Sequence, residues 1–125
     1  MPKQQTVPVK RALTDTEKLL ITRIAAMLSG DVRRQTLLDD MAGATAEVFA
    51  TEGALRIVFY IKGYERPPYR GQHSFGVEGK LNDSDGELLT TDLFADENDR
   101  LLELEIVRYA YGPIKAPDWH SLVLY

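Results

Sequence analysis

The stretch that decides the fold is GELLTTDLFADENDRLLELEIVRY, residues 86–109. Residues 88–95 and 100–109 are two apolar-rich runs, and apolar and charged side chains alternate over 102–106, which is the two-residue period of a half-buried β-strand. Between the two runs, residues 96–99 are Asp, Glu, Asn and Asp, a composition typical of a turn. The stretch is therefore predicted to be a β-hairpin with one apolar face and one strongly acidic face.

The second strand of this hairpin divides its side chains between the two faces. Leu102, Leu104 and Ile106 are predicted to face the core, because they alternate with charged neighbours. The outward set is predicted to be Leu101, Glu103, Glu105 and Val107.

Two helices are predicted before the sheet. Thr14 and Glu17 have the spacing of a capping box, in which the hydroxyl and the carboxylate each bind an amide at the helix start. The apolar residues that follow recur at helical spacing, with Leu20, Ile24, Met27 and Leu28 on the core face and Leu19 at its margin. Asp31 is expected to cap a second helix over 32–42.

The two-residue period resumes after the helices. Residues 44–62 are predicted to form a hairpin, 73–81 a further strand and 122–124 a short edge strand. Since no helix falls between strands, the strands are expected to pair antiparallel. The predicted fold is α+β, with two N-terminal helices packed on one face of an antiparallel meander of four to six strands. One domain is expected over 1–125, with a loose arm at 1–11.

Charge is divided unevenly along the chain, whose net charge is −4. Residues 1–72 hold 11 Lys or Arg and 8 Asp or Glu, a net charge of +3, whereas 73–125 hold 4 and 11, a net charge of −7. A region of one sign repels phosphate backbones and attracts cationic surfaces. The C-terminal half therefore argues against nucleic-acid binding and favours a basic protein partner. The alternative is that these acids only solvate strand edges and turns.

Composition excludes several kinds of site. The chain has no cysteine, so it has no disulfide, thiol nucleophile or cysteine-based metal site. It has no run of 18 apolar residues, and no apolar segment follows the basic residues at its start. We expect a cytoplasmic protein with no membrane partner.

The sequence contains two groups of residues with the types found in metal or catalytic sites. Asp83-Ser-Asp-Gly86 resembles part of a calcium loop, but placing Gly86 at the sixth position puts Leu81 at the first, where Asp is required. His120 beside Asp118 has the residue types of a catalytic dyad, although neighbours in a turn more commonly bond locally. No metal, cofactor or catalytic site is predicted, and the protein is not expected to be an enzyme.

Several of these motifs together resemble a known class of proteins. Arg11-Ala-Leu-Thr14 with Glu17, the turn Asp83-Ser-Asp-Gly86 and the strand Leu102-Glu-Leu-Glu105 resemble a group of short bacterial domains of unknown function. Small, acidic, cysteine-free domains of this kind are similar to the immunity proteins of polymorphic toxin systems, including contact-dependent growth inhibition. The resemblance implies this class, names no partner and brings no catalytic residue with it.

We therefore expect a cytoplasmic immunity protein, an antitoxin that neutralises a cognate toxin by occluding its active or substrate-binding site. The toxin is expected to be a basic nuclease. The predicted contacts are the acids of the hairpin with tyrosine anchors, some of them in the Pro-interrupted loop 63–71, because tyrosine is enriched at interaction hot spots. These residues are Tyr64, Tyr69, Asp92, Asp96, Glu97, Asp99, Glu103, Glu105 and Tyr109.

Two alternatives remain open from the sequence. One is a small enzyme or ligand-binding domain of unknown specificity that uses the acidic sheet face or His120. The other is a subunit that forms a homo-oligomer through its edge strands.

Overall fold

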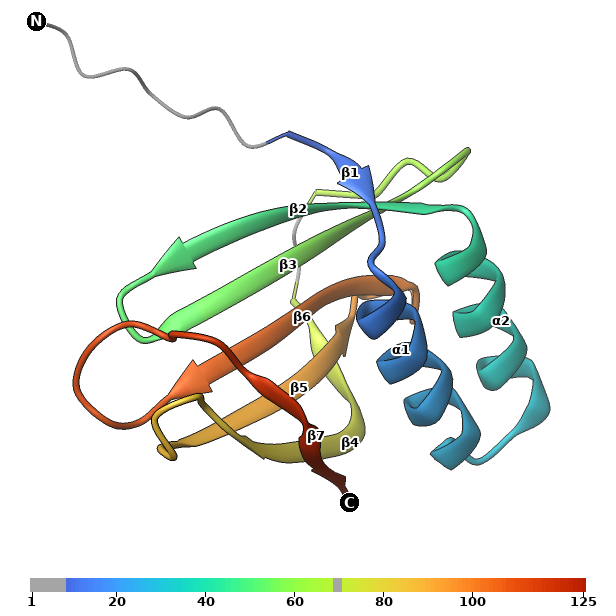
Figure 1. The fold of residues 1–125 in the computed structure, drawn as a ribbon. Helices are drawn as coiled ribbons and strands as arrows, with labels where there is room; N and C mark the ends of the chain where they lie inside the picture. Colours follow the sequence, from blue (N-terminus) through green and yellow to red (C-terminus); the bar gives the residue numbers. More distant parts are fainter. Residues whose placement is uncertain (1–8, 69–70) are drawn as a thin grey trace, which may run out of the picture.

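A computed structural model describes residues 9–68 and 71–125, and these form two helices and one sheet of seven antiparallel strands (Figure 1). The elements are β1 (Arg11–Ala12), α1 (Asp15–Met27), α2 (Asp31–Ala42), β2 (Ala44–Thr51), β3 (Ala54–Ile61), β4 (His73–Asn82), β5 (Leu88–Ala95), β6 (Leu101–Arg108) and β7 (Asp118–Leu124). The predicted α+β class is confirmed, with slightly more strands than expected. None of the described helices is long and apolar enough to cross a lipid bilayer.

The sheet order is β1-β2-β3-β6-β5-β4-β7. The predicted hairpins β2–β3 and β5–β6 are both present, and the final strand is longer than expected. β3 lies beside β6 rather than beside β4, so the chain passes from one half of the sheet to the other between β3 and β4. The acidic hairpin is therefore at the centre of the sheet.

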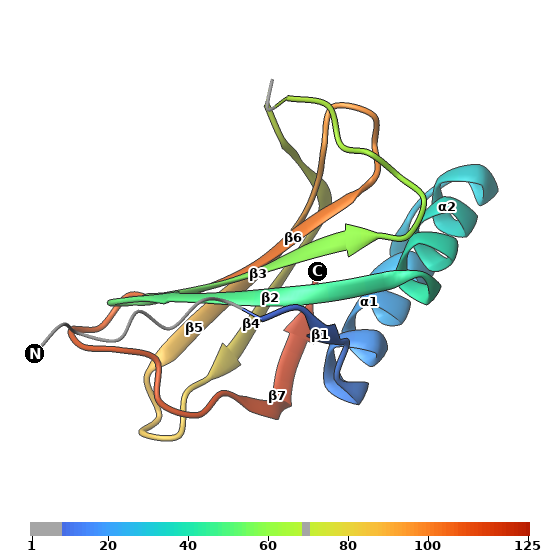
Figure 2. The ribbon, with the colours of Figure 1, turned by 90° about the horizontal axis from the view of Figure 1, so that it is seen from above.

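Both helices cover the same face of the sheet and leave the other face open (Figure 2). Ile21 and Ile24 of α1 and Leu37 of α2 are at most 1% exposed, and they share one core cluster with apolar side chains from five of the strands. Complete burial of a side chain of this size contributes roughly 1.5–3 kcal/mol. The face opposite this core, which we call the open face, carries the outward residues of β2 to β6.

The N-terminus of α1 is fixed by the predicted capping box. The Glu17 amide donates to Thr14 Oγ1 at 3.1 Å, and the Thr14 amide donates to Glu17 Oε1 at 2.9 Å. The same carboxylate accepts from Arg11 at 2.7 Å, and Arg11 pairs with Ala46 in the sheet. The expectation of a loose arm at 1–11 is therefore wrong at Arg11, and residues 1–8 of that arm lie outside the described residues.

Two helix assignments need correction. Met27 is 47% exposed, whereas Ile21 and Ala25 are fully buried. The reason is that α1 packs against α2 as well as against the sheet, so the buried side of α1 lies nearer to α2 than the sequence predicted. Asp31 is the first residue of α2 rather than its cap, and it bonds to Arg34 at 3.0 Å.

A β-bulge changes the inward set of β6. Ala95 pairs with Leu101 and Phe94 pairs with Glu103, so Leu102 is an extra residue on β6. An extra residue reverses the faces on one side of the bulge. The predictions for Leu101 and Leu102 are therefore wrong: Leu101 is buried in the helix-side core, and Leu102 lines a hollow on the open face. Beyond the bulge the predicted alternation holds, with Leu104 and Ile106 inside and Glu103, Glu105 and Val107 outside.

Removing the capping hydroxyl with Thr14→Ala is expected to lower the free energy of unfolding by about 1 kcal/mol, the usual contribution of an N-cap. Urea unfolding followed by circular dichroism measures the change. Thr16→Ala is the matched control, because Thr16 is exposed in the same helical turn and caps nothing. Equal unfolding midpoints for the two variants would contradict the structural role of the cap.

Candidate functional site

Three carboxylates lie in a row across the open face. Glu78 on β4 is directly opposite Asp92 on β5, and Asp92 is directly opposite Glu105 on β6. The next position, on β3, is Arg56. Like charges directly opposite one another on adjacent strands are destabilising. We call Glu78, Asp92 and Glu105 the acidic row.

The middle member of the acidic row is the most constrained. Asp92 is half-buried and accepts a hydrogen bond from Ser74 Oγ at 2.6 Å. Burial raises the pKa of Asp92, and the nearby Glu78 carboxylate raises it further, whereas the bond from Ser74 lowers it. The net result is a pKa above the ordinary value for Asp. Ionised Asp92 at neutral pH therefore costs the folded protein free energy. An interaction with a cation would recover that free energy.

The arginine at the end of the acidic row is engaged elsewhere. Arg56 Nε and one of its terminal nitrogens donate to the two oxygens of Glu103, at 3.0 and 3.1 Å. The side chain of Glu103 is only 5% exposed. Both of these Arg56 bonds go to Glu103. Glu105 therefore has no bonded cation among the described residues.

Aromatic side chains accompany the acids on the open face. Phe49 of β2 lies opposite Arg56, and Phe94 of β5 lies opposite Glu103. Both rings are half-buried, as is Tyr60. Sequence reasoning did not select Phe49 or Phe94, although the alternation within 44–51 and 88–95 places both of them opposite the core. Half-exposed aromatics beside charges are typical of protein-binding surfaces.

A shallow hollow of about 340 Å³ lies beside the acidic row. Its lining residues are Arg56, Val58, Gln72, Leu102, Glu103 and Glu105. The β-bulge that turns Leu102 outward supplies part of its apolar wall.

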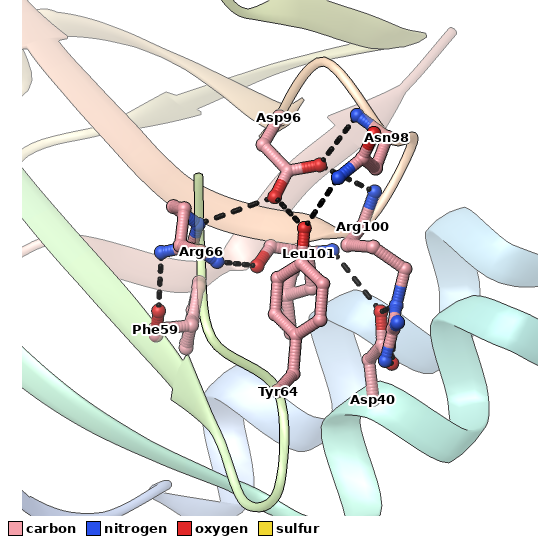
Figure 3. A network of polar contacts seen from close by, with 8 residues as sticks. All are labelled: Asp40, Phe59, Tyr64, Arg66, Asp96, Asn98, Arg100 and Leu101. Carbon is pink, nitrogen blue, oxygen red and sulfur yellow. Dashed lines mark hydrogen bonds and ion pairs between the residues drawn. The ribbon is translucent and has the colours of Figure 1, made fainter. Parts of the chain in front are cut away.

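The turn between β5 and β6 is held from within by Asp96 (Figure 3). This carboxylate is 3% exposed and accepts bonds from the Tyr64 hydroxyl at 2.7 Å and from Arg66 Nε at 3.3 Å. It also accepts from the amides of Asn98 and Arg100, at 2.9 and 3.0 Å. Burial alone would raise the pKa of Asp96, but these donors lower it below its ordinary value. Asp96 is therefore a structural anchor rather than a free surface charge.

The arginines around Asp96 extend the network to the rest of the fold (Figure 3). Arg66 donates to the carbonyl oxygens of Phe59 and Leu101, at 3.0 and 2.6 Å. Arg100 donates to Asp40 of α2 at 2.7 Å, and its guanidinium lies 4.3 Å from the centre of the Tyr64 ring. The turn is thereby joined to the segment after β3 and to the helix layer.

The predicted contact residues thus fall into different groups. Four of them bond mainly within the chain: Tyr64, Asp96, Asp99 and Glu103. Asp99 binds Arg33 and His73, at 2.9 Å each. Asp92 and Glu105 come together on the open face. Glu97 and Tyr109 are exposed at opposite ends of the hairpin. Tyr109 accepts a hydrogen bond from Thr90 at 3.3 Å. Tyr69 lies outside the described residues.

The turn that resembles a calcium loop has a different role. Asp83 and Asp85 both accept bonds from the buried Arg108, at 2.8 Å each. Asp83 also accepts from the amides of Lys115 and Ala116, and Arg108 holds the pKa of Asp85 well below its ordinary value. These carboxylates fasten the segment after β6 to the β4–β5 turn. Within 9–68 and 71–125, no group of three or more His, Asp or Glu side chains is arranged to hold a metal ion.

Comparison with known proteins finds no matching protein-family model, no matching curated protein and no matching solved structure.

Removing the charge with Asp92→Asn is expected to raise the free energy of unfolding at pH 7 by a few tenths to about 1 kcal/mol, the range of a cross-strand pair. The pKa of Asp92 is raised in the folded state, so the gain is largest above that pKa and disappears as the pH falls toward the ordinary value of 3.8. Urea unfolding between neutral and acid pH measures it. Glu97→Gln is the control for loss of one exposed negative charge, and an equal gain there would contradict the repulsion within the row.

Asp96→Ala is expected to lower the free energy of unfolding at pH 7 by about 3 kcal/mol, because it leaves Arg66 and the bonded amides without their acceptor. The pKa of Asp96 is lowered in the folded state, so its contribution is present above 3.8 and is lost as the pH falls below that value. The variant should therefore lose less stability than the parent between about pH 5 and pH 2. Identical acid-unfolding profiles for the parent and the variant would rule this out.

Proposed function

We propose that the chain is a binding protein that inhibits a basic partner through its open face, acting in the cytoplasm as an immunity protein against a nuclease toxin. The observation that carries the proposal is the acidic row. It places three like charges on adjacent strands, with the pKa of the central one raised. Sites that hold a charge at a cost to stability are frequently binding sites.

A cationic side chain from the partner would remove the cost of the acidic row. A Lys or Arg seated between Asp92 and Glu105 would meet two carboxylates that share no bonded cation among the described residues. Phe49 and Phe94 would supply apolar contact around that centre. The negative field would raise the association rate and favour basic partners over acidic ones.

A nuclease fits this chemistry because it must hold a phosphate backbone with Lys and Arg side chains. An inhibitor that presents carboxylates at the spacing of adjacent strands occupies the same cationic surface and excludes the nucleic acid. The capping sequence Arg11–Glu17 and the turn Asp83–Gly86, which resemble those of short bacterial domains similar to immunity proteins, support the same class.

The hollow beside the row supports a second candidate, a site for a small cationic ligand. Its volume of about 340 Å³ is within the usual range for small-molecule sites, and Glu105 in its lining has no bonded cation among the described residues. A ligand seated there would contact residues around Leu102 and leave Glu78 unaffected.

Charge reversal of the outer members of the row tests the proposed function. The partner to test is a toxin domain found in a gene adjacent to this one. The double variant Glu78→Lys/Glu105→Lys is expected to bind it roughly 100-fold more weakly than the parent, because close interfacial charge pairs couple by several kcal/mol. Titration calorimetry at two salt concentrations measures affinity, and co-expression with the toxin domain measures protection of the cell.

The matched control is Glu52→Lys/Glu87→Lys, which makes the same change in net charge at exposed positions between strands. It is expected to retain affinity and protection. If both double variants bind like the parent, the open face is not the inhibitory surface. Asp96 and Glu103 are left unchanged because their substitution would disturb the fold.

A further inference from the structure

We propose that β7 is the site at which a second copy of the chain binds, the two β7 strands pairing antiparallel about a two-fold axis to make one sheet across both copies. β7 is the last strand in the sheet order, and no other described strand pairs with its outer side. At the opposite edge, β2 is partly covered by β1. This inference rests on the edge of the sheet and is independent of the acidic row.

The backbone of β7 offers the groups that such pairing needs. Tyr125 and Glu78 exchange both amide–carbonyl bonds at 2.9 Å, which directs the backbone groups of Tyr125 toward β4. In an antiparallel ladder the next residue points its groups away. Leu124 therefore presents its amide and carbonyl outward. Leu122 is placed in the same way by the Val123–Lys80 pair, and the register between β7 and β4 shifts only beyond that pair.

β7 has few charged side chains, which is typical of a strand that is paired on both sides. Asp118 is its one charged residue, while Val123 is 61% exposed and the adjoining Tyr125 is 51% exposed. Edge strands of monomeric proteins usually carry Lys, Pro or other charges that prevent pairing. A strand with little charge is also where two copies of an acidic chain meet with least repulsion.

The helix layer continues this apolar edge. α1 lies between β7 and α2 (Figure 1), and Leu19 and Arg23 of α1 line a small hollow with Trp119 and Leu122. Leu19 is 62% exposed and Met27 is 47% exposed, and the helical repeat places both beside Arg23 on the side of α1 away from α2.

A second copy is the occupant that fits both layers of this edge. A two-fold axis through β7 makes the strand its own antiparallel partner, because such an interface is formed by the same surface on both subunits. It also brings the two α1 helices together, so that Leu19 and Met27 meet apolar side chains of the same kind. A basic partner would find only Asp118 on β7 to recognise.

Sedimentation of the full chain over roughly 5–500 μM is expected to show a dimer that dissociates on dilution. The double variant Leu19→Glu/Val123→Glu should weaken dimerisation at least 10-fold, because it places like charges on both layers of the edge. The matched control Val32→Glu/Leu88→Glu makes the same charge change at positions that are 82% and 45% exposed elsewhere, and it should dimerise like the parent. A monomer at every concentration, or equal weakening by both variants, would overturn the proposal.

Amide hydrogen exchange followed by NMR identifies the edge directly. The amides of Leu122 and Leu124 are expected to exchange slowly in the concentrated parent and quickly in the Leu19→Glu/Val123→Glu variant. Circular dichroism shows whether the variant has kept its fold. A dimer in which both amides exchange at the rate of the monomer would assign the contact to another surface and overturn the role of β7.

Discussion

The carboxylate of Asp96 is the interaction on which the arrangement of this fold depends. It binds Tyr64 and Arg66 from the segment after β3, and it closes the turn between β5 and β6 through two amides. Arg66 adds bonds to carbonyl oxygens at the end of β3 and the start of β6. Two strands far apart in the chain are thereby held as neighbours, which brings Arg56 beside Glu103 and Glu105.

The pairing of β3 with β6 separates acids that are similar in sequence into two roles. Glu103 and Asp96 are buried and satisfied by arginines, so their charges stabilise the fold. Asp92 and Glu105 lie on adjacent strands with Glu78 beyond them. Arg56 is opposite Glu105, but its two side-chain bonds go to Glu103. The net charge of the C-terminal half therefore overstates the charge available to a partner, and the available part is concentrated in the acidic row.

The sequence predicted those features that depend on neighbouring residues. The capping box at Thr14, the two hairpins and the alternation beyond Leu104 all follow from local periodicity and turn composition. The bulge at Leu102 was missed because Leu101 and Leu102 are adjacent and of the same type, so the sequence does not say which of the two faces the core. The partners of the acids were missed because they are distant in the chain: Arg56 is 47 residues from Glu103, and Arg33 is 66 residues from Asp99. Without knowledge of those partners, every acid of the hairpin was predicted to be available to a binding partner.

The two proposed surfaces adjoin, because Glu78 of the acidic row bonds to Tyr125 beside β7, but they are compatible because they face different directions. Continuing the sheet through β7 keeps both helix layers on one side and both open faces on the other, so dimerisation would leave each acidic row uncovered. Two rows on the same side would strengthen the negative field felt by a basic partner. The reverse arrangement, with copies meeting through their acidic rows, would bring more carboxylates beside Asp92, whose pKa is already raised by burial and by Glu78 within one chain. The electrostatics therefore favour self-association at β7, whose one charged residue is Asp118, and binding of a cationic partner at the open face.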